Sequence, residues 1–378
     1  MKIKNLTQKK FKILWIGPFI PNKYSIKWPA SSPAATKWQK HLVQGLIRLN
    51  CDLEWIYYRP DSYWPKGRLF PSREIISFDA NFKTTQVDYF NFFGFRNSTK
   101  KFLLKKILND KKKSNNSKPI ILITYNAPKW INEIFLDKKI SEDFFQIYLL
   151  ADDKEPNIGN GYVFLSNYSY KKCKHNKKLH LDGGIYPRID KLNLQKSFKK
   201  NKKTIFLYSG SMHKWGGVET LLKSLKFIKN NNFELWISGP GESATTKMAS
   251  LSDKRIKFYG LLPDHQLNRL YQKATVFLNP RPIEMPGNEH SFPSKLFDYL
   301  AWKKPIISTW TKSLTADYKN ILHITKDSPE DFANAMFLYI GNKQKKLKVS
   351  RNFKKKKNWK NQAQRLVLFL NRIIKKKD

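Results

Sequence analysis

The amino-acid sequence predicts an α/β protein with two parallel-sheet domains in tandem. Short apolar runs alternate with helical patterns over the first 190 residues, and the same alternation starts again near residue 204. A polar, lysine-rich stretch without apolar periodicity lies between the two series. With 378 residues, 40% of them hydrophobic, the chain can bury two cores.

Six apolar runs in the first half have the length of buried strands. They span residues 11–16, 53–57, 119–124, 145–150, 162–165 and 178–181. Between the first two, residues 34–49 place Trp38, Leu42, Leu46 and Leu49 on one helical face. This strand–helix–strand order predicts βαβ units and hence a parallel sheet.

Five further runs predict the strands of the second half. They span residues 204–209, 233–237, 255–259, 275–278 and 305–307. Near residue 328 a helix start is expected, because Ser328 can cap, Pro329 fits the first helical position, and Glu330 suits the positive end of a helix. We therefore expect an N-terminal domain over 1–190, a linker over 191–203, a C-terminal domain over 204–358 and a terminal helix over 359–378.

The formal net charge of +43, with only 29 acidic residues, is the most unusual global feature. Three interpretations are open: a compositional bias toward lysine and asparagine, attraction to an anionic membrane leaflet, and binding to nucleic acid. The sequence has neither an apolar run of membrane-spanning length nor a signal peptide, so we expect a cytoplasmic protein. Cys51 and Cys173 are far apart, which suggests reduced, structural thiols and no zinc site.

The segment 279–308 is the most informative for function. A strand runs into a loop punctuated by proline and glycine, and Phe292, Pro293, Ser294 and Lys295 then open a helix. Unpaired amides at a helix start, together with the Lys295 ammonium, can hold a diphosphate. Asp298 lies one turn further along the same face, where it could accept hydrogen bonds from sugar hydroxyls or simply pair with Lys295.

Three glycine loops follow strands in the same half. Gly210 and Lys214 belong to the first, Gly239 and Gly241 to the second, and Gly260 to the third. Glycine lets the backbone approach phosphate closely, although each loop alone could be ordinary turn chemistry. All of them come after the carboxyl ends of strands, where open α/β sheets bind ligands.

Taken together, these motifs resemble those of the retaining glycosyltransferases of family 4. The resemblance is strong over residues 204–310, in FLYSGSMHKWGGVETLL, LWISGPGE, FLNPRP and FPSKLFDYLAWKKPIIS, and diffuse over 11–188. It implies a GT-B fold: two Rossmann-like parallel-sheet domains facing a central cleft, with a C-terminal helix that returns to the first domain. It also implies retention of anomeric configuration, no bound metal and no cofactor beyond the nucleotide-sugar donor.

The resemblance assigns roles to individual residues. As catalytic residues it implies Asp153, Lys214, Lys295 and Asp298. As donor-binding residues it implies Gly210, Ser211, Gly239, Gly241, Glu242, Gly260, Leu262, Arg281, Glu289, His290, Phe292, Pro293 and Ser294. On the acceptor side it implies Gly17, Pro18, Ser31, Ser32 and Thr36.

Two departures from the family pattern concern the donor site. The family usually carries two glutamates eight positions apart, but the position eight residues before Asp298 is His290, and Glu289 is one position off. The usual basic residue after the first glycine is replaced by Ser211. Both departures bear on which sugar the protein accepts.

The expected partners are a nucleotide sugar and a glycan or lipid-linked acceptor, as in surface polysaccharide synthesis. Residues 99–113 form a basic amphipathic pattern, which fits either peripheral contact with the inner face of the plasma membrane or a surface helix packed on the sheet. Alternative functions are a nucleotide-sugar epimerase and a nonenzymatic polyanion binder on the same fold. The ordered phosphate loops argue against nucleic acid as the main partner.

Overall fold

The structure is a computed structural model. It describes residues 10–19, 32–71, 83–115, 118–152, 158–187, 203–241, 252–342 and 347–375. The chain divides into two compact units: unit 1 comprises Met1–Gly183 and Asn358–Asp378, and unit 2 comprises Gly184–Lys357. Among the helices in these ranges, none is long and apolar enough to cross a membrane.

Unit 1 is built on a seven-stranded sheet in which every paired strand is parallel to its neighbour. The strand order is β3-β2-β1-β4-β5-β6-β7. The strands are β1 (Lys12–Pro18), β2 (Asp52–Tyr58), β3 (Lys83–Gln86), β4 (Ile120–Tyr125), β5 (Phe145–Leu150), β6 (Gly161–Phe164) and β7 (Lys178–His180). The central strands are buried on both faces, as their continuous apolar runs predict.

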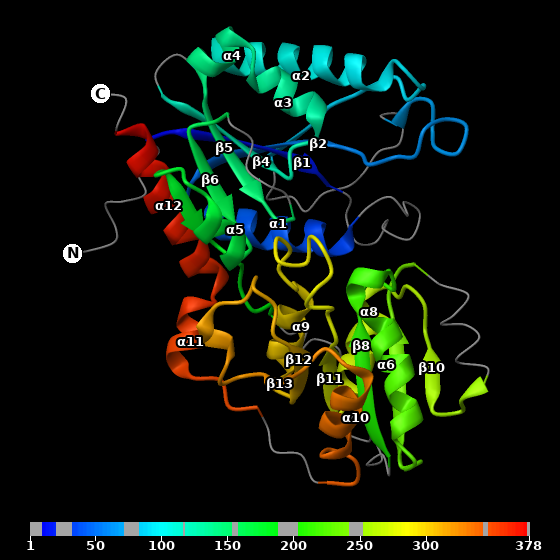
Figure 1. Ribbon diagram of the computed structural model, residues 1–378. Coiled ribbons are helices and arrows are strands. Elements are labelled where there is room, and N and C mark those ends of the chain that lie inside the picture. Colours follow the sequence, from blue (N-terminus) through cyan, green and yellow to red (C-terminus); the bar gives the residue numbers. More distant parts are fainter. Residues whose placement is uncertain are drawn as a thin grey trace. The chain divides into compact units, whose positions relative to one another are not determined.

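Helices cover both faces of this sheet (Figure 1). On one side lie α2 (Arg96–Lys113), α3 (Lys129–Phe135) and α4 (Lys138–Asp143), and on the other α1 (Pro33–Ile47) and the terminal α12 (Trp359–Ile374). A short α5 (Asn167–Lys172) follows β6.

The terminal helix α12 packs on α1. The Trp38 and Trp359 ring centroids are 5.8 Å apart, and the Trp38 indole donates to the Asp182 carbonyl at 2.9 Å. The apolar face predicted for α12 is buried there: Ala363, Leu366 and Leu370 are fully or almost fully inaccessible.

Helix α2 resolves the two alternatives left open for residues 99–113. Leu104 and Leu108 are buried in the core between α2 and the sheet of unit 1. The apolar side of the helix is therefore used for packing within unit 1. Phe102 is the exception, because it is 70% exposed on the outer face. The surface-helix interpretation is the one that these contacts support.

Unit 2 contains a six-stranded parallel sheet with the order β10-β9-β8-β11-β12-β13. The strands are β8 (Thr204–Ser209), β9 (Phe233–Ser238), β10 (Ile256–Phe258), β11 (Val276–Asn279), β12 (Ile306–Thr309) and β13 (His323–Thr325). The predicted α/β class with two parallel sheets is therefore confirmed.

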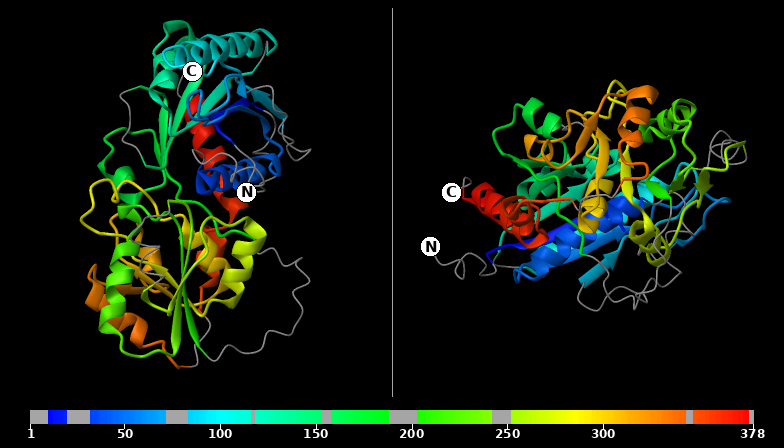
Figure 2. Two further views of the ribbon diagram at one scale, coloured as in Figure 1. Left: turned by 90° about the vertical axis from the view of Figure 1, so that its right-hand side faces the viewer. Right: turned by 90° about the horizontal axis from the view of Figure 1, so that it is seen from below.

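The helices of unit 2 also lie on both faces of its sheet (Figure 2, left view). Helices α6 (Val218–Ser224) and α10 (Pro329–Phe337) share a core with one face, whereas α8 (Asp264–Lys273) and α9 (Lys295–Trp302) pack on the other. Helix α10 begins as predicted, since Ser328 Oγ accepts from the Asp331 amide at 3.0 Å. The remaining short elements are η4 (Lys214–Gly216), η5 (Leu225–Phe227), η6 (Ala316–Tyr318) and α11 (Arg351–Lys356).

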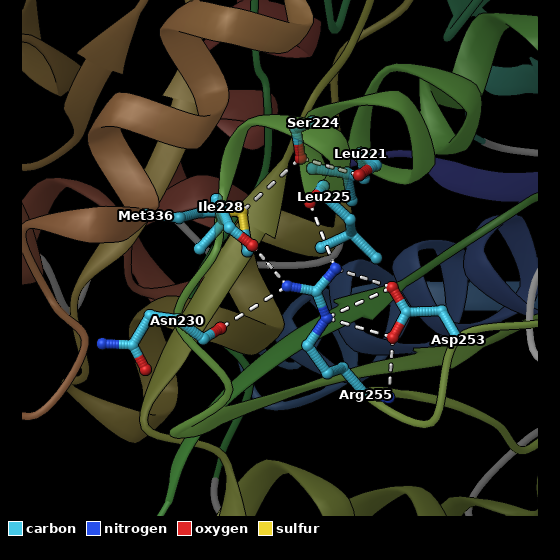
Figure 3. A network of polar contacts seen from close by, with 8 residues as sticks. All are labelled: Leu221, Ser224, Leu225, Ile228, Asn230, Asp253, Arg255 and Met336. Atoms are coloured by element: carbon cyan, nitrogen blue, oxygen red, sulfur yellow. Dashed lines mark hydrogen bonds and ion pairs between the residues drawn. The ribbon is translucent and has the colours of Figure 1, made fainter.

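One arginine braces the sheet at the end opposite its carboxyl edge (Figure 3). Arg255 pairs with Asp253, at 2.7 Å between Nη2 and Oδ2, and also donates to the carbonyls of Leu225 and Ile228. It therefore ties both ends of η5 to the segment just before β10.

Two strands lie outside the sequence prediction. Both are three or four residues long, partly polar and at an edge: β3 reads KTTQ and β13 reads HIT. The expected linker lies mostly outside the described residues, because residues 188–202 are not among them.

Candidate functional site

The site of interest in unit 2 is the carboxyl edge of the sheet where the strand order reverses. From β8 the chain moves outward to β9 and β10 and then crosses back to β11 on the other side of β8. Loops 210–217, 239–241 and 280–293 follow β8, β9 and β11 at this edge, and Gly260 comes shortly after β10. Open α/β sheets bind ligands at such a reversal.

The three glycine loops are in direct backbone contact. The Gly210 amide donates to the Ser238 carbonyl and the Gly239 amide donates to the Gly260 carbonyl, both at 2.9 Å. A Cβ on Gly239 would overlap the Gly210 carbonyl. The structure thus brings Gly210, Gly239 and Gly260 together, with no room for a side chain between the first two.

Lys295 lies against the first of these loops. Its Nζ is 3.9 Å from the centroid of the Tyr208 ring, and a Cβ built on Gly210 would be 2.7 Å from the same Nζ. Burial, and then the nearby Arg281 guanidinium, hold the pKa of Lys295 well below its usual range. Within the described residues Lys295 forms no ion pair, so the alternative of a simple pair with Asp298 is not realised.

The first turn of α9 presents its amides at this place. Ser294 is the N-cap, and within the described part of the chain neither its amide nor that of Lys295 has a protein acceptor. Pro293 directly precedes the cap, close to the first turn of the helix as the sequence predicts. Phe292 is buried, with its ring stacked on Phe297 at 5.1 Å, so its side chain positions the loop.

A clamp built on Asn288 holds the loop after β11. Asn288 is 2% exposed; its Oδ1 accepts from Arg281 Nε at 2.9 Å, and its Nδ2 donates to the Pro282 carbonyl at 2.8 Å and the Trp215 carbonyl at 3.5 Å. Arg281 is therefore fixed by the fold beside Lys295. The clamp also joins this loop to the one after β8.

The turn that carries Lys214 is tightly packed, whereas the Lys214 side chain is exposed. Gly217, at φ +77°, lies against the Pro280 carbonyl, where a Cβ would overlap it. The Tyr208 hydroxyl donates to the Ser211 carbonyl at 2.5 Å. The His213 amide donates to the Ser211 hydroxyl at 3.3 Å. Lys214 thus stands on a fixed turn beside Gly210, with its ammonium in solvent.

Buried tyrosines support the opposite side of the reversal. The Tyr299 hydroxyl accepts from the Ser209 amide at 2.9 Å, and the Tyr271 hydroxyl lies 3.0 Å from Ser209 Oγ. Burial raises the pKa of both phenols well above their usual value, and the Asp298 carboxylate adds to the rise. Asp298 is half-buried beside them.

The other expected donor residues lie around these loops. A Cβ on Gly241 would be 3.3 Å from the His213 imidazole, and the Gly260 carbonyl already accepts from Ser238 Oγ. Leu262 is half-buried, and His290 Nε2 lies 3.8 Å from Glu289 Oε1. Glu242 lies outside the described residues.

In unit 1, the expected acceptor residues gather at the corresponding reversal between β1 and β4. Gly17 and Pro18 end β1 against Gln39, whose side-chain amide Nε2 donates to the Pro18 carbonyl at 3.2 Å. Ser32 caps α1 and Thr36 is buried in its first turn. Ser31 and Asp153 lie outside the described residues.

The neighbour of Asp153 has a defined contact. Asp152 Oδ2 accepts from Asn126 Nδ2 at 3.1 Å, and Asn126 Oδ1 accepts from the Ala151 amide at 2.6 Å. These bonds join the loops after β4 and β5 beside the Gly17 turn.

No group of three or more histidine, cysteine, aspartate or glutamate side chains that could hold a metal ion occurs in the described part of the chain. Cys51 and Cys173 are free thiols, and burial raises the pKa of Cys51 to about 11.

Four residues that build the site were not singled out from the sequence: Tyr208, Tyr271, Tyr299 and Asn288. Tyr208 and Tyr299 belong to apolar patterns that already explain them as core residues. Asn288 sits in the sequence PGNEH, where an asparagine reads as an ordinary turn residue. Only its burial reveals the clamp.

Comparison with known proteins adds a family match to this geometry. Residues 203–342 match the model of the family "Glycosyl transferases group 1". The match covers the unit 2 part of the candidate site, from β8 to α10. No curated protein sequence matches the chain.

Solved structures of the same fold cover nearly the whole chain. Sucrose-phosphate synthase from Thermosynechococcus elongatus is similar with a TM-score of 0.66 and 11% identity, over 97% of this chain and 100% of that one. A lipopolysaccharide outer core galactosyltransferase in its apo form has a TM-score of 0.60 and 15% identity, over 97% of this chain and 100% of that one. An Anabaena protein in complex with UDP and glucose has a TM-score of 0.56 and 11% identity, over 97% of this chain and 98% of that one. These likenesses confirm the predicted GT-B fold.

Proposed function

We propose that the protein is a glycosyltransferase that moves a sugar from a nucleoside-diphosphate sugar to a hydroxyl of a glycan or lipid-linked acceptor. The observation that carries this proposal is the meeting of Lys295, the Gly210 loop and the free amides of α9 at the strand-order reversal of unit 2. The match of residues 203–342 to the group 1 glycosyl transferases supports the same reaction class.

In this proposal the bond between the anomeric carbon and the diphosphate oxygen breaks, and its electron pair leaves with the diphosphate. The acceptor hydroxyl oxygen forms the new bond to the anomeric carbon and gives up its proton. Negative charge grows on the leaving diphosphate, so a cation and helix amides already aimed at it lower the barrier. Lys295 and the Ser294 amide supply this stabilisation, and Lys214 adds a mobile charge from the opposite loop.

Four finer features belong to the proposal. The reaction retains anomeric configuration, as in the family 4 enzymes that the motifs resemble, and the charge on the diphosphate is met by lysine and amides without a metal ion. Asp298 contacts the donor ribose, and the reversal of unit 1 around Gly17 receives the acceptor in surface polysaccharide or glycoconjugate synthesis.

The reaction class is tested by following a nucleotide sugar with proton NMR in the presence and absence of candidate acceptors. A glycosyltransferase releases nucleoside diphosphate and forms a product of the donor's own anomeric configuration, faster with acceptor than by hydrolysis. An epimerase would convert the donor sugar with no acceptor present, which would overturn the transferase proposal.

The clamp itself is tested by the Lys214→Ala/Lys295→Ala double variant. Charge-assisted hydrogen bonds contribute roughly 1.5–3 kcal/mol each, so donor turnover should fall at least about 100-fold. The thermal midpoint should change little, because Lys214 is exposed and Lys295 is a half-buried cation that forms no ion pair within the described residues. Turnover at the wild-type rate would show that another group holds the diphosphate.

A further inference from the structure

We propose that unit 1 docks on an anionic lipid bilayer through an exposed aromatic patch formed by the loops after β2 and β3. The aromatic patch consists of Tyr63, Trp64, Phe70, Phe90, Phe92, Phe93 and Phe95. Phe93 is 75% exposed, Phe95 59% and Trp64 47%. In Figure 1 the segment after β2 and the first turn of α2 lie at the same end of the unit 1 sheet.

Five rings of the patch are linked by direct ring contacts, and Tyr63 and Phe93 form a second pair next to them in the chain. Phe90 stacks on Phe92 with centroids 5.9 Å apart, and Phe92 lies 6.0 Å from Trp64. Phe90 also reaches Phe70 at 5.6 Å, and Tyr63 reaches Phe93 at the same distance. Clustered exposed apolar side chains of this kind mark interaction sites, whereas single ones do not.

Polar groups lie beneath the patch and fix it. Asn91 is fully buried; its Nδ2 donates to the carbonyls of Ser62 and Arg68, both at 2.7 Å. The Arg96 guanidinium lies 3.5 Å from the Tyr63 ring centroid and donates to the Asp61 carbonyl. The two loops therefore bury their hydrogen-bonding groups and hold their aromatic rings outward, which is the arrangement expected of a surface that meets an apolar medium.

The charge of the chain favours an anionic bilayer over a second copy of the chain as the partner that binds the aromatic patch. The whole chain carries +43, so two copies would repel each other across this surface while anionic lipid would attract it. Lys66 beside Trp64 and Lys106 on the outer face of α2 are exposed, whereas Lys101 and Lys105 are occupied by ion pairs within unit 1.

The chemistry of the rings fits the same occupant. Tryptophan, tyrosine and phenylalanine concentrate where apolar and polar media meet, and tryptophan and tyrosine are enriched at the water interface of bilayers. The patch requires the aromatic loops, and not an amphipathic α2, because the apolar side of α2 is buried in the core.

Docking through this patch would bring the proposed acceptor end of unit 1 to the membrane surface. The loops after β2 and β3 follow parallel strands, so they lie at the same sheet edge as the Gly17 turn after β1. This consequence rests on the proposed function and narrows the acceptor to the lipid-linked class.

The test is sedimentation of the full chain with vesicles of phosphatidylcholine containing 30% phosphatidylglycerol, beside vesicles of phosphatidylcholine alone. The patch variant is Trp64→Ser/Phe93→Ser/Phe95→Ser. The matched control is Phe337→Ser/Leu338→Ser, which removes two residues of unit 2 that are 59% and 62% exposed. We expect wild type and control to bind the anionic vesicles, and the patch variant to bind at least tenfold more weakly with an unchanged circular dichroism spectrum.

Three results would overturn the docking proposal. They are absence of vesicle binding by wild type at low salt, equal binding by the patch and control variants, and a dimer in solution that the patch substitutions abolish. Quenching of Trp64 fluorescence by brominated lipid, measured as the difference between wild type and Trp64→Phe, provides a second readout. Binding of nucleotide sugar to the same proteins without vesicles is measured separately, so failure of docking and failure of the proposed reaction are distinguishable.

Discussion

The Lys295 ammonium is the charge that a bound anion would stabilise most. It lies over Tyr208, against Gly210 and near a second cation, Arg281, and forms no ion pair within the described residues. Removal from water and the like charge both lower its pKa. A diphosphate would reverse both effects, because an opposite charge favours the protonated form.

Gly217 offers a test of whether the loop contacts are required. It has φ +77° and lies against the Pro280 carbonyl, whereas Gly341 has φ +74° with nothing within 4 Å of the position of a Cβ. Gly341→Ala should therefore cost only the left-handed backbone strain, about 1–2 kcal/mol. Gly217→Ala must in addition move the loop after β11, so chemical denaturation should show a clearly larger loss of unfolding free energy.

The two alanine variants should also differ in ligand binding. Gly217→Ala should weaken nucleotide-sugar affinity, because the displaced loop carries Arg281, while Gly341→Ala should leave it unchanged. Equal losses of stability and unchanged affinity in both would show that the Gly217 contact is irrelevant to the site.

At the scale of elements, the packing of α12 on α1 depends on the lack of a side chain at Gly45. A Cβ at this position would be 2.9 Å from both the Ala363 Cβ and the Trp359 carbonyl oxygen. Gly45→Val should separate the two helices and lower the unfolding free energy by roughly 1–3 kcal/mol, as for overpacked cores.

The control for this change is Ala34→Val, which places the same side chain on an exposed position of α1. Its thermal midpoint should stay within a few degrees of wild type, since exposed substitutions are usually worth less than about 0.5 kcal/mol. A Gly45→Val variant as stable as Ala34→Val would contradict the close helix contact.

The elements that could be predicted from the sequence are those whose own residues indicate that they are buried or capped. Strands such as β4 and β8 are continuous apolar runs, and α10 begins with a serine and a proline at the expected positions. The strands β3 and β13 are short edge strands with polar side chains, so their existence depends on a neighbour that the local sequence does not reveal. The part of the aromatic patch that follows β3 was not predicted, because β3 itself was not.

For the site, the sequence predicted which loops contribute but not how they are held. Gly210, Gly239 and Lys295 meet because the strand order places their loops side by side. Asn288 holds Arg281 and Tyr208 contacts Lys295 only because both side chains are buried. Their burial depends on contacts between segments far apart in the chain. The roles of Asp298 and Lys214 toward a ligand are still predictions.

At the scale of the whole molecule, the proposal makes unit 2 a receptor for nucleotide sugar and unit 1 the part that meets the acceptor and the membrane. The positive charge of the chain favours both, because the donor diphosphate and an anionic bilayer are negative. The donor half of this account is the part on which the rest depends.

The most direct test is a calorimetric titration of wild type and Lys295→Met with UDP-, GDP- and ADP-sugars at pH 7 and at pH 9. The complex should hold the Lys295 proton more tightly than the free protein, so the affinity for the preferred donor should fall as the pH rises. Lys295→Met should bind at least about tenfold more weakly at pH 7 and lose this pH dependence. Equal affinity of the two proteins for every donor, or no binding by wild type, would contradict the account.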